Sequence, residues 1–332
     1  MRILKTIRIV SAFSVLQVLL ISQPNNVSTA SSVSLGPTLA QLVSYVDASS
    51  RLRHGPNVFT SLPTLAQAGD NTPDASFMIP KKCLAYTPAA KPLPSNAGTT
   101  CAFGDTRATK TLLLFGDSQA SMWFAAFNIA GEILHWKIVF LARDGCSPWI
   151  GPSTSIEGSS ACNKWVRGEI AIANHLKPQV VVPVGLGPAE LNDHKYPSTH
   201  QFELELQSMV KALAPSRAKV IFLQEIPQFY PYLTSTTPES CLTVHASSIQ
   251  SCELTIKQVR SIEATVGLTE VAATDHLDTV PIRKLFCGSK RCVVFVDSPG
   301  ESHLVYQDWA HMNATYSAWI GPATAQLIAK YL

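Results

Sequence analysis

Short runs of consecutive apolar residues alternate with longer stretches of helical periodicity from Thr111 onward. Strands that are apolar throughout and are separated by helices are typical of a parallel sheet covered on both faces. The pattern therefore predicts an α/β fold, a three-layer α/β/α sandwich with a mainly parallel central sheet. The apolar runs predict strands over Thr111–Phe115, Lys137–Leu141, Val180–Val184 and Lys219–Leu223. The periodic stretches predict helices over Ser121–Ile133, Cys162–Leu176, Phe202–Leu213, Ile249–Val266 and Thr315–Lys330.

The residues before this alternation are less regular and predict an extension to the main domain. Residues 31–82 are rich in Ser, Pro, Ala and Thr and show a weak helical pattern from Leu39 to Val46. Prolines between residues 84 and 100 favour a loop there. We expect residues 31–100 to form an extension or linker, partly packed on a main domain of residues 101–332 and joined to it through Cys83 and Cys101.

Residues 1–30 have the features of an export signal. Basic residues precede an uncharged, mostly apolar stretch from Ile9 to Ile21, which is shorter than the roughly 20 residues that a membrane span needs. The small residues Ser28-Thr29-Ala30 suit cleavage by a signal peptidase. The segment is predicted to be either a cleaved signal peptide or a retained N-terminal membrane anchor. In both cases the remainder is extracytoplasmic, secreted or anchored to the outer face of the cytoplasmic membrane.

The cysteine content agrees with export. An even count of eight in an oxidising compartment indicates disulfides. Eight cysteines allow 105 connectivities, and sequence-local pairing is the default that we adopt. It joins Cys83 to Cys101, Cys146 to Cys162, Cys241 to Cys252 and Cys287 to Cys292. The sequence contains neither a Cys-x-x-Cys nor a His-x-x-x-His spacing, so we predict no metal site.

The overall composition limits the classes of partner. The chain is 46% hydrophobic and 15% charged, which is enough apolar material for a sizeable core. Its net charge is only +3 and it has no run of lysine and arginine, so the charge gives no reason to expect binding to nucleic acid.

Two short motifs far apart in the chain carry the candidate chemistry. Gly116-Asp117-Ser118 follows the first predicted strand, so that Ser118 lies on a tight turn before a helix. Free backbone N–H groups and the helix dipole favour negative charge at such a position. The amide of Ser118 can therefore donate to an oxyanion that develops on a substrate.

The second motif is Asp308-Trp309-Ala310-His311, about twenty residues before the end of the sequence. Taken singly, Asp308 and His311 are as compatible with a solvated loop or a helix cap as with catalysis. Together with Ser118 they supply the three groups of a Ser-His-Asp hydrolytic site, in which the carboxylate orients the imidazole and the imidazole accepts the serine proton. Other histidines, such as His303 and His245, lack a comparable partner, and His303 is the second choice for the base because it is close in sequence.

The order and joint spacing of several stretches resemble the SGNH (GDSL-like) hydrolase superfamily, and more narrowly the SGNH domain fused to family-three membrane acyltransferases. The resemblance covers roughly residues 60–330. The matching stretches are Leu62-Pro63-Thr64-Leu65, Cys101 to Asp105, Leu112 to Ser118, Gly145-Cys146-Ser147-Pro148, Leu285-Phe286-Cys287 with Cys292, and Asp308 to Asn313.

The resemblance implies roles for individual residues. Ser118 matches the nucleophile, Asp308 and His311 match the final Asp-x-x-His block, and Gly145 matches the glycine whose backbone amide is the second oxyanion donor. The third block departs from the superfamily, because Gly185-Leu186-Gly187 stands where Gly-x-Asn is expected and Asn192 is out of register. Gln119 stands where the fused domains usually carry histidine. Since loss of one oxyanion donor costs about 10²–10³-fold in turnover, we expect a weakened site that hydrolyses small activated esters slowly.

Two functions are compatible with these features. The first is an exported serine esterase or O-acyltransferase that acts on acyl groups, acetyl being the expected one, of cell-envelope glycans through an acyl-Ser118 intermediate. It needs no cofactor, and its partners are an acylated glycan or sugar and, in one arrangement, a separate membrane acyltransferase. The alternative is a non-catalytic glycan-binding or accessory module for such an acyltransferase. Hydrolysis and transfer are not distinguished by the sequence.

Overall fold

The computed structural model describes residues 36–55, 82–85, 93–151, 159–185, 199–229, 237–259, 272 and 277–332. Residues 35–332 form one compact unit. The predicted signal segment and the residues Leu186, Gly187 and Asn192 lie outside the described residues. None of the helices in the described ranges has both the length and the apolar character that a bilayer crossing requires.

A seven-stranded sheet forms the centre of this unit, and it is parallel along its main path. In sheet order the strands are β1 (Leu84–Ala85), β4 (Lys137–Arg143), β3 (Thr111–Gly116), β5 (Val180–Val184), β6 (Lys219–Leu223) and β8 (Asp278–Val280). A further strand, β2 (Ala102–Gly104), pairs antiparallel with β4. The four predicted strands are therefore the four central ones. Short strands that the apolar pattern did not indicate extend the sheet at both edges.

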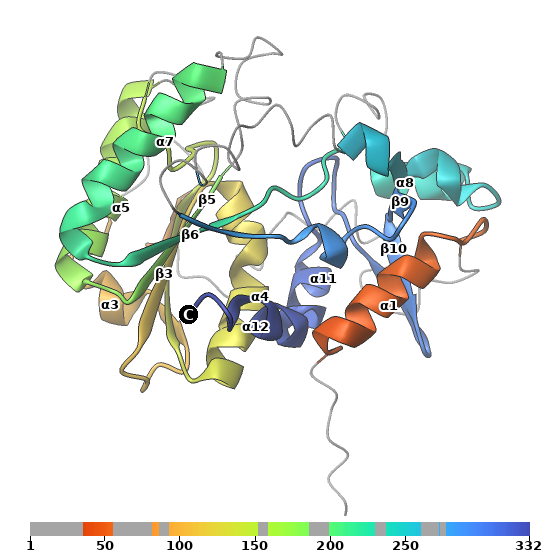
Figure 1. Ribbon diagram of the computed structural model, residues 1–332, viewed down its shortest axis with the longest axis horizontal. Coiled ribbons are helices and arrows are strands. Elements are labelled where there is room, and N and C mark those ends of the chain that lie inside the picture. The colour runs from red at the N-terminus through yellow and green to blue at the C-terminus, as the bar shows by residue number, and fades with distance from the viewer. Residues whose placement is uncertain are drawn as a thin grey trace, which may run out of the picture. The chain divides into compact units, whose positions relative to one another are not determined.

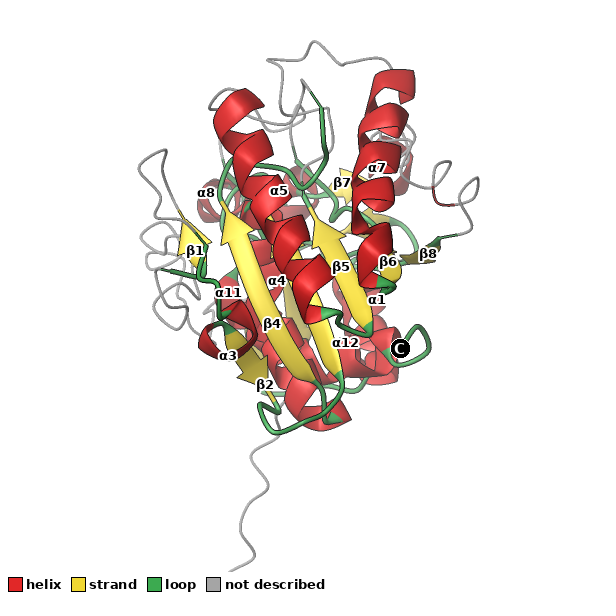
Figure 2. Cartoon of the chain, turned by 90° about the vertical axis from the view of Figure 1, so that its left-hand side faces the viewer, coloured by secondary structure: helices red, strands yellow, loops and turns green. Residues whose placement is uncertain are grey.

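Helices cover both faces of the sheet, which confirms the predicted three-layer sandwich. Figure 1 shows α4 (Ser118–Leu134) and α12 (Gly321–Ile328) on one face and α5 (Ser159–Leu176) and α7 (Thr199–Leu213) on the other. In Figure 2, α5 and α7 lie in front of the strands, and the arrowheads of β4 and β5 point the same way. The central strands are buried almost throughout because both faces are covered.

The predicted C-terminal helix is interrupted. It consists of α11 (Ala314–Trp319) and α12, separated at Ile320. Gly321 packs so closely on α4 that an added Cβ would lie 2.7 Å from the Ile129 side chain. Pro322 follows in the first turn of α12, where the missing N–H costs no intrahelical hydrogen bond. Both pieces contact α4.

The prediction of a helix over Ile249–Val266 is wrong for residues 249–255, whereas residues 256–259 are helical and residues 260–266 lie outside the described residues. Residues Ile249–Cys252 form a short 3₁₀ helix, and Leu254–Thr255 form strand β7, which pairs with β9 (Arg291–Cys292). Cys252 is held by its disulfide to Cys241 in helix α8 (Pro238–Val244). These long-range constraints override the helical periodicity of residues 249–255.

The N-terminal extension contributes a helix to the compact unit. Helix α1 (Leu39–Ser49) begins at a capping box formed by Thr38 and Gln41, and Leu42 and Val46 are fully buried. The backbone N–H of Leu39 donates to the side chain of Gln326 in α12. Helix α1 also contacts the hairpin of β10 (Phe295–Ser298) and β11 (Glu301–Leu304). The remaining short elements are α3 (Ala97–Thr100), a 3₁₀ turn at Ala214–Ser216 and another at Arg283–Leu285.

The structure forms all four disulfides that sequence-local pairing predicts. They are Cys83–Cys101, Cys146–Cys162, Cys241–Cys252 and Cys287–Cys292, and no cysteine is free. The first joins the residue before β1 to the residue before β2, and the second joins the loop after β4 to α5. Disulfides of this density are typical of an oxidising compartment.

Candidate active site

The turn between β3 and α4 positions Ser118. Gly116 has φ +149°, and an added Cβ would lie 1.7 Å from the carbonyl oxygen of Val184 in β5, so only glycine fits there. Asp117 is the N-cap of α4, and its Oδ1 accepts the backbone N–H of Gln119 at 2.8 Å. Ser118 is therefore the first residue of α4, at the carboxyl end of a central parallel strand, where ligands bind in sheets of this kind. The sequence predicted that Ser118 follows the first strand of the domain. This is wrong, because two short strands, β1 and β2, precede β3 in the chain.

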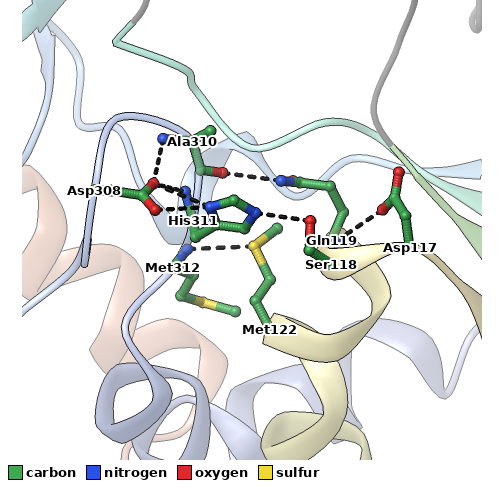
Figure 3. A network of polar contacts seen from close by, with 8 residues as sticks. All are labelled: Asp117, Ser118, Gln119, Met122, Asp308, Ala310, His311 and Met312. Carbon is green, nitrogen blue, oxygen red and sulfur yellow. Dashed lines mark hydrogen bonds and ion pairs between the residues drawn. The ribbon is translucent and has the colours of Figure 1, made fainter. Parts of the chain in front are cut away.

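Residues 193 positions apart in the chain meet at Ser118. His311 Nε2 lies 2.8 Å from Ser118 Oγ, and His311 Nδ1 lies 2.8 Å from Asp308 Oδ2 and 3.1 Å from Oδ1 (Figure 3). Asp308 Oδ1 also accepts the backbone N–H groups of Ala310 and His311, each at 2.7 Å. The side chains of His311 and Asp308 retain 19% and 29% of their surface exposed, so a substrate can reach the imidazole.

The electrostatic environment keeps Asp308 ionised. Burial alone would raise the pKa of this carboxyl, but the hydrogen bond and charge of His311, together with the two backbone N–H donors, outweigh it. The net effect is a pKa below the usual range for aspartate. An ionised Asp308 holds the proton of the ring on Nδ1, which leaves Nε2 as an acceptor toward the Ser118 hydroxyl.

Contacts from α4 fix the loop that carries Asp308 and His311. The side-chain amide of Gln119 donates to the carbonyl of Ala310 at 3.0 Å, and the N–H of Met312 lies 3.2 Å from the sulfur of Met122 (Figure 3). Gln119 directly follows the nucleophile and Ala310 directly precedes His311, so this hydrogen bond links the two parts of the site. Sequence reasoning noted Gln119 only as a departure from the usual histidine, and no local pattern indicates its partner.

The second choice for the base, His303, lies in a different environment. Its ring stacks on Trp319 with centroids 3.8 Å apart, and its Nε2 is 3.2 Å from Glu301. Burial lowers the pKa of His303 to about 4, although the nearby Glu301 acts in the opposite direction. His303 is a buried structural histidine that faces Glu301, and His311 is the imidazole that faces Ser118.

Gly145 lies in the loop that follows β4, the strand next to β3 in the sheet. It has φ +71°, and no heavy atom outside its chain neighbours lies within 4 Å of an added Cβ. The disulfide from Cys146 to Cys162 begins at the next residue. Ser118 and Gly145 thus follow the carboxyl ends of adjacent strands. That their backbone amides donate to the same oxyanion stays a prediction.

A buried polar group lies behind the nucleophile turn. Glu169 in α5 accepts the indole N–H of Trp165 at 2.9 Å, and the guanidinium of Arg143 lies 5.7 Å from the centre of the Trp165 ring system. Burial raises the pKa of Glu169 well above its ordinary value despite that hydrogen bond, and the negative charge of Asp117 adds to the rise. This shift favours the protonated form of Glu169, the form that places no second buried negative charge near Asp117.

Metal ligation has no support in the described part of the chain. No group of three or more His, Cys, Asp or Glu side chains there is arranged to hold a metal ion.

Comparisons with known proteins identify related domains. The family described as "SGNH domain (fused to AT3 domains)" matches residues 82–326. The periplasmic domain of a lipopolysaccharide acetyltransferase from Salmonella ser. Paratyphi A is similar in structure, with 14% sequence identity and a TM-score of 0.53 over 75% of this chain and 90% of that chain. At this identity the likeness concerns the fold.

Two further structures match with lower scores. One is a GDSL-like lipase from Bacteroides thetaiotaomicron, with 13% identity and a TM-score of 0.38 over 67% of this chain and 89% of that chain. The other is the acetyl xylan esterase AlAXEase, with 12% identity and a TM-score of 0.39 over 67% of this chain and 99% of that chain. The search of curated proteins found no match.

Proposed function

Since the chain belongs to the family of SGNH domains of the kind fused to AT3 domains, we propose that it is an exported serine esterase or O-acyltransferase whose catalytic residues are Ser118, His311 and Asp308. The observation that carries this proposal is the contact of 2.8 Å between His311 Nε2 and Ser118 Oγ, with Asp308 on the other ring nitrogen. A hydroxyl, an imidazole and a carboxylate in this order generate a nucleophile without a cofactor.

The geometry supports a two-step acyl transfer. Ser118 Oγ attacks the ester carbonyl while its proton passes to His311 Nε2, and the resulting imidazolium is stabilised by Asp308. Collapse of the tetrahedral intermediate breaks the ester bond, and the departing alkoxide takes the proton from Nε2. Water or an acceptor hydroxyl then attacks the acyl-Ser118 ester, with its proton taken by Nε2, and Ser118 recovers a proton when its ester bond breaks.

The oxyanion of each intermediate is held, in this proposal, by the backbone amides of Ser118 and Gly145. The amide of Ser118 is in the first turn of α4, where N–H groups have no intrahelical acceptor. Such preorganised donors supply a large part of the barrier reduction in acyl transfer. The third-block position, Gly187, carries no side-chain donor.

The proposed substrates are acyl groups, in particular acetyl groups, of cell-envelope glycans. The fold shared with the periplasmic domain of a lipopolysaccharide acetyltransferase is consistent with a glycan partner. The four disulfides support an extracytoplasmic location. A separate membrane acyltransferase is the proposed donor of the acyl group where the reaction is a transfer.

Labelling with a fluorophosphonate probe tests the nucleophile, and release of acetate from p-nitrophenyl acetate and from acetylated glycans tests the reaction. We expect the wild-type protein to be labelled and to release acetate, and Ser118→Ala to do neither. Ser317→Ala is the matched control, because Ser317 is a fully buried serine that accepts an N–H of the same helix α4 at 3.2 Å. A folded wild-type protein that is not labelled and releases no acetate contradicts the proposal and favours the non-catalytic glycan-binding module.

A further inference from the structure

The ends of three adjacent strands converge on one buried carboxylate, that of Asp117. Its Oδ1 caps α4 through the N–H of Gln119, and its Oδ2 accepts the hydroxyl of Ser147 at 2.8 Å. Ser147 is fully buried in the loop after β4. The same carboxylate therefore joins the first turn of the nucleophile helix to the loop that carries Gly145.

Three consecutive residues anchor this loop. Cys146 is bonded to Cys162 of α5, Ser147 to Asp117, and Pro148 packs on Gly185 so tightly that a Cβ at Gly185 would lie 2.2 Å from the Pro148 ring. That Cβ would also lie 3.2 Å from Asp117 Oδ2. The glycine at the end of β5 thus leaves room for the contact between the loop and the carboxylate.

A hydrogen bond from a hydroxyl to a buried carboxylate is directional and stronger than one between neutral groups. Two side-chain hydrogen bonds connect the residues around Gly145 to the start of α4. Ser121 donates to Asp144 at 3.4 Å, and Ser147 donates to Asp117 at 2.8 Å. The bond at Ser147 is the shorter one and is buried, and an added Cβ at Gly145 would meet no heavy atom within 4 Å.

We infer that the Asp117–Ser147 hydrogen bond is a positioning element of the oxyanion site. It holds the backbone amide of Gly145 where it can donate, together with the amide of Ser118, to the same oxyanion. The inference rests on the proposed function, because it assigns a catalytic purpose to the position of Gly145. Ser147 acts through Gly145 and is a positioning residue, since it does not touch the reacting atoms in this scheme.

The first experiment compares Ser147→Ala with Ser317→Ala. Both substitutions remove a fully buried hydroxyl that is hydrogen-bonded to α4 or its cap. Phenylboronic acid is the probe, because Ser118 Oγ adds to boron, its proton passes to His311, and a boron hydroxyl occupies the oxyanion position. We expect its Kd to rise about 10-fold to 100-fold in Ser147→Ala, as for other small displacements of a catalytic group, with the KM of p-nitrophenyl acetate little changed. In Ser317→Ala the boronate Kd should stay within about twofold of wild type, since no oxyanion donor moves.

A second measurement, independent of catalysis, is amide hydrogen exchange of the peptide spanning residues 143–149. Ser147→Ala, and separately Asp117→Asn, should accelerate its exchange, whereas Ser317→Ala should not, because only the first two loosen this loop. If the wild-type protein neither binds the boronate nor hydrolyses esters, the proposed function fails, and the exchange data alone decide whether the hydrogen bond holds the loop. Unchanged boronate affinity in an active Ser147→Ala enzyme, or unchanged exchange in that variant, overturns the inference.

Discussion

Replacing Asp308 by asparagine tests the candidate triad at the atom that orients the imidazole. The two carboxylate oxygens have different partners. Oδ1 accepts the backbone N–H groups of Ala310 and His311, each at 2.7 Å, whereas Oδ2 lies 2.8 Å from His311 Nδ1. In Asp308→Asn the amide oxygen must stay at the Oδ1 position to satisfy the two backbone donors. The amide NH₂ group then faces Nδ1.

This arrangement reverses the tautomer of the ring. Nδ1 becomes the acceptor, the proton moves to Nε2, and Nε2 can no longer take the proton of Ser118. The corresponding change in a well-studied serine protease lowers kcat about 10⁴-fold. We expect a loss of about 10³–10⁴-fold in kcat/KM here, equal to about 4–5.5 kcal/mol of transition-state stabilisation.

The assay is steady-state hydrolysis of p-nitrophenyl acetate together with the rate of fluorophosphonate labelling. Asp47→Asn is the matched control. Its side chain is 33% exposed, compared with 29% for Asp308, and it also accepts a backbone N–H, that of Ser289 at 2.8 Å. An Asp308→Asn variant that folds and keeps more than about a tenth of wild-type kcat/KM would refute the assignment of Asp308, because the wrong tautomer cannot act as a base.

The pH dependence of stability gives a further check on Asp308. Its pKa is lowered in the folded protein, so its ionised form stabilises the fold above the pKa of an unfolded aspartate, about 3.9. That contribution is lost as the pH falls through the lower folded-state pKa. The stabilisation that the Asp308 charge gives wild type relative to Asp308→Asn should therefore shrink as the pH falls below about 4.

Three further predictions concern the loop after β4, a buried carboxyl and the third block. Replacing Cys146 and Cys162 by alanine opens a loop with a sequence separation of 16 and should lower the unfolding free energy by about 3 kcal/mol. Urea melts of both proteins without reductant measure this, and a variant as stable as wild type would contradict it. Glu253 is buried, and both its carboxylate oxygens lack a hydrogen-bond partner among the described residues. Burial raises its pKa to about 8, so the folded protein holds more protons than the unfolded chain between about pH 4.3 and that value. The unfolding free energy of wild type should therefore fall as the pH rises across this interval, by at most about 5 kcal/mol. Urea melts at several pH values should show no such fall for Glu253→Gln, and an equal fall in the variant would contradict the assignment to Glu253. Gly187→Asn should raise hydrolysis of p-nitrophenyl acetate by up to about 10²-fold by adding an oxyanion donor, whereas fast wild-type turnover that the substitution leaves unchanged would direct attention to Asn192.

The sequence alone predicted the central strands and indicated the three candidate catalytic residues, whereas for the disulfides it offered only sequence-local pairing as a default. The strands and the three residues each have a local signal. A buried parallel strand such as Thr111–Phe115 is apolar at every position because both faces of the sheet are covered. The turn at Ser118 is indicated by a glycine and a capping aspartate directly after that strand. Asp308 and His311 are three residues apart, so one short loop brings them together.

Only the tertiary structure decided which long-range partners these residues meet. Strands of two or three residues, such as β1 and β8, are too short to show a period, and they exist because a neighbouring strand offers them hydrogen bonds. The helical pattern over residues 249–255 is overridden by a disulfide and a strand pairing.

The polar contacts behind the site depend on tertiary structure in the same way. Ser147 donates to Asp117 across 30 positions of sequence, and Gln119 donates to Ala310 across 191. His303 and His311 are close to each other in sequence, but His303 stacks on Trp319 and His311 faces Ser118. Tertiary packing determines which group lies within hydrogen-bond distance of a serine hydroxyl, an amide or an imidazole. Hydrophobic periodicity does not indicate that partner.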